Sequence, residues 1–183
     1  MKTVISHYKE DVTKSLMKDF GFSSVMAIPK ITKVVVNTGV GSLKDDNKRT
    51  HIIESLRAIT GVNPLARKAK TSIASFKLRE GQIIGYASTL RGKRMDDFLT
   101  KLIHVAIPRI RDFRGLSLGL IDNMGNLSIG FKDHTVFPEA GEEDVRSAFG
   151  LGVNIVTTAK TKDEARALFL GIGIPFIKEE TVK

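Results

Sequence analysis

The sequence contains no cysteine and no tryptophan, and no apolar run in it is long enough to cross a membrane. The lack of cysteine excludes disulfide bonds, thiolate metal sites and a cysteine nucleophile, and it is typical of a chain that works in a reducing cytoplasm. The first charged residues are not followed by an apolar segment, so we expect no secretory leader. These absences favour a cytoplasmic protein with no membrane contact.

Familiar catalytic and metal-binding patterns are missing as well. The four histidines are never three or four positions apart, and no His-Glu-x-x-His or Gly-x-Ser-x-Gly sequence occurs. The turn "NTGVG" at 37–41 is neither Gly-x-Gly-x-x-Gly nor a phosphate loop ending in Gly-Lys-Ser/Thr. We therefore expect no metal, no cofactor and no enzymatic activity. The competing hypothesis is an RNA-modifying or nucleotide-dependent enzyme that uses this turn, but it lacks a base, a nucleophile and a metal set.

Charge of one sign dominates the middle of the chain. Residues 67–114 carry 12 basic and four acidic side chains, whereas residues 115–183 carry seven basic and ten acidic ones; the whole chain has a formal net charge of +9. A surface that only has to stay soluble mixes both signs along the sequence. A basic block beside a balanced remainder indicates a face that binds a polyanion.

Within this block, basic side chains alternate with hydroxyl and aromatic ones, which suits an RNA surface. The basic residues are Arg67, Lys68, Lys70, Lys77, Arg79, Arg91, Lys93 and Arg94, and the hydroxyl residues are Thr71, Ser72, Ser75, Ser88 and Thr89. Phe76 lies among them, where it could stack on a base. Two alternatives stay open: an ordinary solvated surface, and a DNA-architectural protein that would bind duplex DNA as well as structured RNA.

The phrase "PRIRDFRGL" at 108–116 places three arginines within six residues, with apolar side chains between them. The arginines are Arg109, Arg111 and Arg114, the apolar residues are Ile110, Phe113 and Leu116, and Asp112 is the one acid. Guanidinium groups donate in a planar fork, and packed apolar neighbours would hold them with little loss of rotamer entropy. The phrase suits contact with RNA or an acidic protein face. An internal clamp, pairing arginine with Asp112 or the acidic C-terminal third, is the alternative.

Hydrophobic periodicity predicts one α+β domain over residues 1–183, with a mostly antiparallel sheet, helices on one face and an open opposite face. We expect helices over 4–20, 45–60, roughly 94–107, and one that begins at 161–164. We expect strands over 31–37 and 152–159, two strands within 65–91, and a hairpin over 116–131. Thr161 and Glu164 form a capping box, Gly61 ends the second helix, and Gly171 or Gly173 ends the last.

The segment 71–81 connects the two strands of the basic block. We expect it to be a mobile loop in the free protein. One aromatic residue, Phe76, among charged neighbours buries too little area to offset the ordering of about ten residues, at roughly 1–2 kcal/mol each for the backbone.

Five phrases resemble one protein family in their order and spacing: "VVVNTGVG", "KAKTSIASFKLREGQ", "STLRGKRM", "IPRIRDFRGLS" and "VFPE". They are similar to the bacterial large-subunit ribosomal proteins that bind 5S rRNA, the fifth in the large-subunit numbering. The resemblance covers about residues 3–178. Val62 stands where the family usually has glutamine, and Lys70-Thr71 stand where Arg-Lys is usual, so one polar group and one charge are missing here.

The resemblance implies a structural rRNA-binding protein of the central protuberance of the large subunit, located on the cytoplasmic ribosome. Its partners would be 5S rRNA, 23S rRNA and the neighbouring 5S-binding ribosomal proteins. A concave sheet face would approach 5S rRNA. The residues assigned to this contact are Asn37, Thr38, Gly39, Gly41, Arg67, Lys68, Lys70, Thr89 and Arg91.

Two further contacts are implied by the same resemblance. The loop at 71–81 would reach P-site tRNA through Ser72, Ser75, Phe76, Lys77 and Arg79. The C-terminal part, from about residue 95, would form a lobe that faces the small-subunit head and bridges to the thirteenth small-subunit protein. The residues assigned to the bridge are Arg109, Arg111, Asp112 and Arg114, together with the 132–144 loops.

Overall fold

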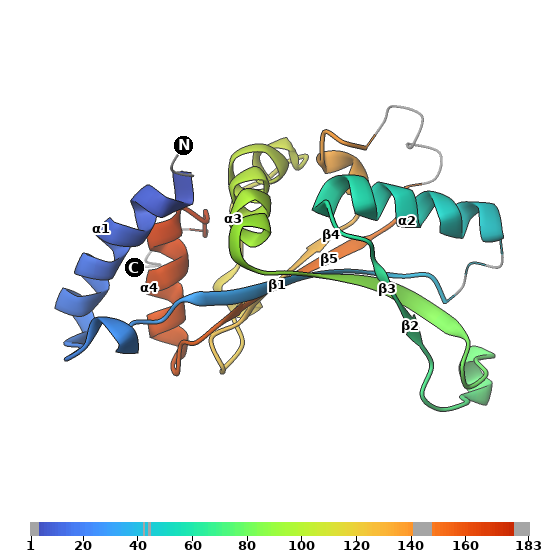
Figure 1. Cartoon of the computed structure of the whole chain (residues 1–183), viewed down its shortest axis with the longest axis horizontal. Coiled ribbons are helices and arrows are strands. Elements are labelled where there is room, and N and C mark those ends of the chain that lie inside the picture. The colour runs from blue at the N-terminus through green and yellow to red at the C-terminus, as the bar shows by residue number, and fades with distance from the viewer. Residues whose placement is uncertain (1–3, 42, 44, 141–147, 178–183) are drawn as a thin grey trace, which may run out of the picture. The chain divides into compact units, whose positions relative to one another are not determined.

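The fold combines α-helices with an open antiparallel sheet, as a computed structural model of residues 4–41, 43, 45–140 and 148–177 describes it (Figure 1). The helices are α1 (Val4–Phe20), α2 (Asp46–Thr60), α3 (Gly92–Lys101) and α4 (Lys162–Ile172). The strands are β1 (Ile31–Gly39), β2 (Leu65–Lys68), β3 (Ile83–Leu90), β4 (Leu127–Phe131) and β5 (Leu151–Thr157). The predicted α+β class is confirmed.

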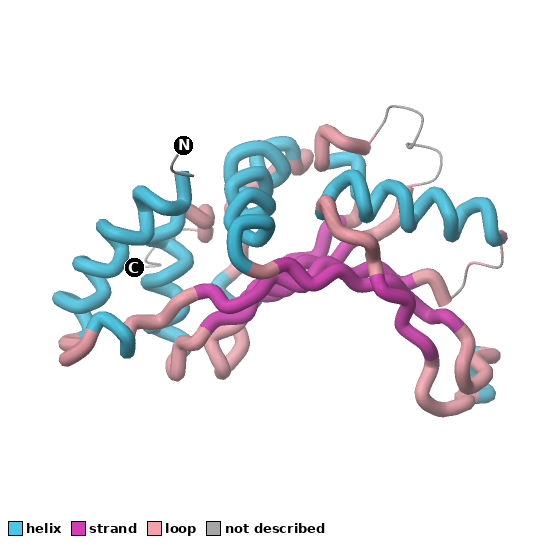
Figure 2. The backbone as a smooth tube through the Cα atoms, viewed as in Figure 1, coloured by secondary structure: helices cyan, strands magenta, loops and turns pink. Residues whose placement is uncertain are grey.

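The five strands form one sheet in the order β2-β3-β1-β5-β4. Figure 2 shows the strands in magenta. β2 and β3 pair antiparallel. β1 and β5 also run in opposite directions, because the Thr32 hydroxyl donates to the Val156 carbonyl at 3.1 Å while the Thr38 hydroxyl donates to the Gly150 carbonyl at 2.7 Å. β1 therefore lies in the middle of the sheet, between the basic hairpin β2–β3 and the C-terminal strands.

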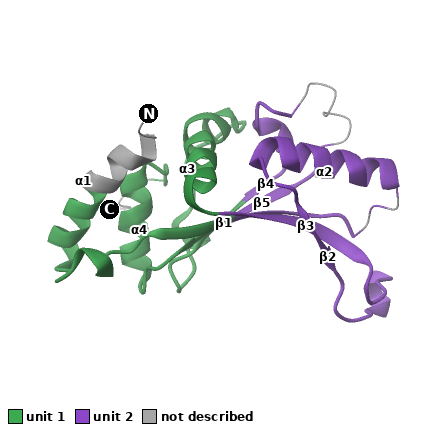
Figure 3. Cartoon of the chain, viewed as in Figure 1, with its two compact units in different colours: residues 1–34, 91–129, 154–183 green, residues 35–90, 130–153 purple. Residues whose placement is uncertain are grey.

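The chain divides into two compact units that interleave along the sequence (Figure 3). Unit 1 comprises residues 1–34, 91–129 and 154–183, and unit 2 comprises residues 35–90 and 130–153. In unit 1, α1 packs against α4 and α3, and Leu16, Leu99 and Phe169 are fully buried there. In unit 2, α2 packs against β3 and buries Leu56 and Ile59.

The helix ends follow the local rules that predicted them. The Glu164 N–H donates to the Thr161 hydroxyl at 3.3 Å, and the Thr161 N–H donates to the Glu164 carboxylate at 3.4 Å, so the capping box is confirmed. Gly61 and Gly173 adopt left-handed φ values of 67° and 95° and end α2 and α4. Gly171 lies inside α4, so the choice between the two glycines falls on Gly173.

The third helix differs from its prediction. α3 begins at Gly92 and ends at Lys101; a π-helical turn, Leu102–Ala106, and a 3₁₀ turn, Ile107–Arg109, then complete the segment. The Ile107 N–H donates to the Leu102 carbonyl, five residues back. Pro108 has no N–H to continue an α-helical ladder, and the widened turn leads the chain into the proline.

The predicted hairpin over 116–131 is only half present. Its second arm is β4, but its first arm is a 3₁₀ turn, Leu118–Leu120, with a single bridge between Ile121 and Leu127. The Ser117 hydroxyl accepts from the Gly119 N–H at 3.2 Å, a local side-chain bond that competes with strand pairing. Alternating apolar residues were therefore not sufficient for a strand here.

The turn between these arms has a pH-dependent stability. Asp122 accepts from the Asn126 side chain at 2.9 Å, the Asn126 N–H at 2.6 Å and the Met124 N–H at 3.0 Å. Hydrogen bonds from the Asn126 side chain and the Asn126 N–H lower the pKa of Asp122 most; desolvation opposes them, and the Met124 N–H adds a lesser lowering effect. Because the carboxylate form is favoured in the folded state, its stabilisation is present above the unfolded pKa and is lost as the pH falls through the lowered folded pKa.

We therefore expect Asp122→Ala to reduce the free energy of unfolding at pH 7 by about 1 kcal/mol, or about 2–4 °C in Tm. The difference from the parent protein should shrink as the pH is lowered below about 4. Thermal unfolding at pH 7 and pH 3 measures both quantities. Asp133→Ala is the control, because Asp133 is exposed and caps its 3₁₀ turn with no side-chain bond. An equal Tm difference at both pH values would contradict the assignment.

Candidate nucleic-acid interface

The sheet of unit 2 presents one bare face. Along β1, Val34, Val36 and Thr38 are buried, whereas Asn37 and Gly39 between and after them are exposed. Such alternation means that one side of the strand meets the core and the other meets solvent. Helix α2 lies along one side of the strands of unit 2, and no helix in the described part of this unit covers the other side (Figure 1). The exposed side is available to a ligand.

Asn37 lies on this open face beside a glycine of β5. A Cβ atom at Gly152 would stand 2.7 Å from Asn37 Oδ1, closer than such atoms approach. The missing side chain of Gly152 therefore makes room for the amide of Asn37. No local pattern in the sequence marks Gly152, since its role depends on which strand pairs with β1.

Thr38 points to the other side of the sheet from Asn37. It is 5% exposed, and its hydroxyl donates to the Gly150 carbonyl at 2.7 Å. The hydroxyl is thus engaged within the fold and ties β1 to the residue before β5. Gly39 and Gly41, assigned to the same contact, follow on the chain, with Gly41 close to the backbone of Ile84.

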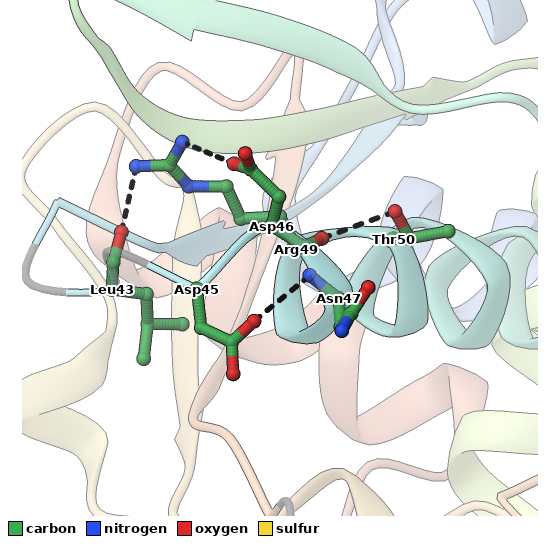
Figure 4. Close-up of polar contacts among 6 residues, drawn as sticks. All are labelled: Leu43, Asp45, Asp46, Asn47, Arg49 and Thr50. Atoms are coloured by element: carbon green, nitrogen blue, oxygen red, sulfur yellow. Dashed lines mark hydrogen bonds and ion pairs between the residues drawn. The ribbon is translucent and has the colours of Figure 1, made fainter.

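The segment after β1 is fastened to the first turn of α2 (Figure 4). The Arg49 guanidinium donates to the Leu43 carbonyl at 2.6 Å and to Asp46 Oδ1 at 3.1 Å. The Asp45 carboxylate accepts from the Asn47 N–H at 3.0 Å and caps the helix. Before this segment, the Val40 N–H donates to the Ile84 carbonyl at 2.9 Å. Arg49, which the sequence presents as one more helix residue, is therefore the side chain that ties Leu43 to the first turn of α2.

The hairpin β2–β3 carries the next group of predicted residues. Arg67 lies opposite Gly85 and Lys68 opposite Ile83, so Ile84 is an extra residue on β3. A bulge of this kind bends the strand and re-aims neighbouring side chains. Arg67, Lys68 and Lys70 are all exposed, as is Thr89 on β3. Ser88, by contrast, is 1% exposed, so its hydroxyl is not available to RNA.

Arg91 follows the end of β3 by one residue and is the N-cap residue of α3. It is exposed, and its guanidinium forms no ion pair with a residue that the structure describes. Gly92 next to it has a φ of 58°, a left-handed conformation that glycine adopts readily. The chain turns sharply there, which leaves Arg91 at the end of the strand with its side chain in solvent.

The 71–81 segment folds back on itself as a short hairpin, and its mobility in the free protein stays a prediction. Ile73 and Leu78 exchange two backbone hydrogen bonds of 3.1 Å, and the Lys77 N–H donates to the Ala74 carbonyl at 3.0 Å around a 3₁₀ turn. The Ser72 hydroxyl accepts from the Glu80 N–H at 2.9 Å. These bonds close the loop through its own backbone. The area of apolar burial, which was the basis of the prediction, does not include them.

Side chains of the same segment point to solvent. Phe76 is 71% exposed at the tip. Its neighbour Lys77 has a φ of 53°, a left-handed conformation that is uncommon for residues other than glycine. Ser72, Ser75 and Arg79 are exposed as well. A large aromatic ring in water, next to Lys77 at the tip of a short hairpin, is suited to stacking on a base.

The arginine segment, residues 109–114, belongs to unit 1. Its three guanidinium groups are exposed, while Ile110 and Phe113 are half-buried and anchor it. None of the three groups forms an ion pair or hydrogen bond with a residue that the structure describes. The internal clamp to Asp112 is therefore absent from the described residues, and Asp112 itself adopts a left-handed φ of 55°.

Comparison with known proteins fits this arrangement. Residues 24–79 match the family described as ribosomal protein L5, and residues 83–176 match the model for the C-terminus of the same ribosomal family. The large ribosomal subunit protein uL5 of Malacoplasma penetrans is 51% identical over 177 residues, which is 96% of this chain and 95% of the relative. The uL5 protein of Ureaplasma parvum serovar 3 is 51% identical over 172 residues, 93% of this chain and 94% of the relative.

The chain belongs to the L5 family of ribosomal proteins. It is a structural component of the large ribosomal subunit, as the resemblance of its five phrases predicted. The basic block and the exposed cations of this L5-family chain agree with an environment of rRNA. Residues 141–147, which include part of the predicted 132–144 bridge loops, lie outside the described residues.

Metal clusters and membrane spans are both absent from the part of the L5-family chain that the structure describes. No three His, Cys, Asp or Glu side chains there lie close enough to hold a metal ion. No helix among those residues is long and apolar enough to span a bilayer.

Proposed function

We propose that this L5-family chain binds 5S rRNA with the open face of unit 2 and with Arg91. The observation that carries the proposal is the position of Asn37, exposed on that face above Gly152. The Asn37 amide can donate and accept at once, which suits base edges and ribose hydroxyls. Gly39 and Gly41 carry no side chains, so the RNA backbone can approach the chain closely. Thr38 contributes by fixing this strand to Gly150 rather than by its own contact with RNA.

Phosphate contacts come from the cations of the hairpin and from the strand end. Arg67, Lys68 and Lys70 are exposed and lie within one strand and the residues that follow it. Thr89 adds a hydroxyl and Arg91 a guanidinium beside it in the sequence. Such contacts provide affinity and orientation, while the amide of Asn37 reads base or sugar groups. The alternative enzyme function gains no support, because the site combines no base, nucleophile or metal ligands.

The remaining contacts follow from the exposed tip and the arginine segment. Phe76, with Ser72, Ser75, Lys77 and Arg79 around it, contacts P-site tRNA. Arg109, Arg111, Asp112 and Arg114 contact the thirteenth small-subunit protein and form a bridge between the subunits. Within the central protuberance of a cytoplasmic ribosome, the chain also touches 23S rRNA and neighbouring 5S-binding proteins. It acts by structure alone, without enzymatic activity.

Charge reversal at Arg91 tests the first contact. We expect Arg91→Glu to weaken 5S rRNA binding by at least about tenfold, because a charge-assisted bond to phosphate is lost and a repulsive group is added. Its Tm should stay within about 2 °C of the parent, since the side chain is exposed and forms no ion pair with a residue that the structure describes. Filter binding with a duplex DNA competitor measures affinity and selectivity together, and duplex DNA should compete poorly.

Arg57→Glu is the matched control, because Arg57 is an exposed arginine on α2, the helix that covers the opposite side of unit 2. It should leave 5S rRNA affinity nearly unchanged. If Arg91→Glu unfolds the protein, Arg91 is structural. If the two variants lose affinity equally, Arg91 makes no specific contact with 5S rRNA.

A further inference from the structure

The chain after α4 lies against the segment that follows the three arginines. The Leu116 N–H donates to the Pro175 carbonyl at 2.9 Å, and the Ile177 N–H donates to the Leu116 carbonyl at 3.0 Å. These bonds form a parallel bridge between Leu116 and Phe176. We name residues 174–177 the C-terminal strap.

The strap is itself firmly held at its start. Gly173 ends α4, and the Ile174 N–H donates to the Phe169 carbonyl at 3.0 Å. The side chain of Ile174 is 1% exposed. The strap therefore connects the core of unit 1 to Leu116, which is itself buried.

Gly115 is the residue that lets the two segments approach. A Cβ atom at this position would lie 2.7 Å from the Ile177 nitrogen and 2.9 Å from the Phe176 carbonyl carbon, and backbone cannot move aside easily. The residue also has a φ of 114°, where side chains other than hydrogen are strained. Both features make glycine a requirement of the strap contact.

The arginine segment needs such a support, because residues 111–115 lie outside any helix or strand. At its other end, the Ile110 N–H donates to the Ile107 carbonyl at 3.1 Å and completes a 3₁₀ turn. Asp112, between two of the arginines, keeps a left-handed φ of 55°, a conformation that surrounding structure has to maintain. The segment is thus held at both ends, at residue 110 and at residue 116.

We propose that the C-terminal strap positions the arginine segment for its partner. Fixing both ends removes conformational freedom before binding, so less ordering remains to be done when the guanidinium groups meet the small subunit. Residues 174–177 and Gly115 are then positioning residues for the subunit bridge, because they act through the arginine segment. This inference rests on the proposed function of the arginine segment.

Two truncations of the full chain test the holding role directly. Ending the chain after Ile174 removes both strap hydrogen bonds, whereas ending it after Ile177 keeps them and serves as the matched control. We expect the first truncation to speed amide hydrogen exchange at residues 110–116 at least about tenfold while 5S rRNA affinity stays within about twofold. Gly115→Ala should act like the first truncation, and Gly130→Ala, where a Cβ meets no atom within 4 Å, should not. Unchanged exchange at residues 110–116 in both strap variants would overturn the inference.

A double-mutant cycle tests the consequence for the bridge. Large subunits reconstituted with each variant are mixed with small subunits, and their association constant is measured by light scattering. One variant carries Arg109→Gln, Arg111→Gln and Arg114→Gln together. It should weaken subunit association about fivefold or more, and the strap truncation should weaken it as well. Combining both changes should give no further loss, since the strap acts through the arginines.

The outcomes separate the inference from the function on which it rests. Additive losses would mean that the strap acts elsewhere, and the positioning role would be wrong. If the arginine variant weakens association and the strap truncation does not, the positioning role is also wrong. If the arginine variant itself has no effect, the proposed bridge fails, and hydrogen exchange still decides whether the strap holds the segment.

Discussion

Raising monovalent salt from 50 to 200 mM should weaken the binding of this protein to 5S rRNA by about sixtyfold to a thousandfold. If about four to six phosphates are contacted, the slope of log K against log salt is about −3 to −5, because each neutralised phosphate releases condensed counterions. The cations proposed for this contact are exposed side chains of one hairpin and one strand end. Equilibrium binding at four or five salt concentrations gives the slope.

Single substitutions assign this slope to residues. Arg67→Gln should make the slope less negative by about 0.7–0.9 if Arg67 contacts one phosphate. Arg57→Gln, which removes an exposed arginine from α2, should leave the slope unchanged. A slope near zero for the parent protein would mean that hydrogen bonds or apolar contacts dominate and that the basic block has another use.

Local sequence signals predicted those elements whose causes are local. The capping box at Thr161 and the left-handed glycine at residue 61 stood where the spacing placed them, because each depends on atoms within a few residues. The β-branched run of β1 and the apolar stripe of α2 were equally visible, since burial of one face imposes a period on the sequence. The α+β class followed from the order of these elements.

Features that depend on distant residues escaped prediction. Asn37 and Thr38 are adjacent polar residues near the end of β1, and only the pairing of β1 with β5 shows that Thr38 is buried and Asn37 exposed. The role of Gly152 depends on that same pairing. Arg49 looks like any helix cation until the chain before α2 folds back to it. The strand period was visible in the sequence, but the neighbour across the sheet was not.

The arginine segment shows a third kind of limit. Its composition indicated an interaction surface, and its apolar residues indicated an anchor. The support that Leu116 receives comes from Pro175 and Ile177, about sixty residues along the chain, through backbone groups that every sequence possesses. Backbone partners leave no trace in composition except at Gly115, where the close approach excludes a side chain. Gly115, a glycine with no local explanation next to the last arginine, is the sequence signal that could have indicated a close approach of another segment.

Removal of the hairpin tip should separate the two proposed RNA contacts. Deleting residues 71–80 joins Lys70 to Gly81 and leaves a two-residue turn between Ala69 and Gln82. The residues on either side of this turn are already paired, because the Ala69 N–H donates to the Gln82 carbonyl at 2.8 Å. Gly81 already has the positive φ, 81°, that a two-residue hairpin turn uses. Strain at Lys70 in the new turn costs about 1–2 kcal/mol. We expect the fold and 5S rRNA affinity to be retained, the latter within about twofold.

Binding of tRNA to the P site of ribosomes that contain this variant should weaken about tenfold, because the stacking surface of Phe76 is gone. Phe76→Ala is the matched point variant; the ring is 71% exposed, so its loss should reproduce much of the tRNA defect without disturbing the tip. A second deletion with Lys70→Asn relieves the strained turn, and comparing the two shows whether the charge of Lys70 matters to 5S rRNA. Loss of 5S rRNA binding in the first deletion, with the fold intact, would place the tip in the rRNA contact and remove the proposed division between the two RNAs.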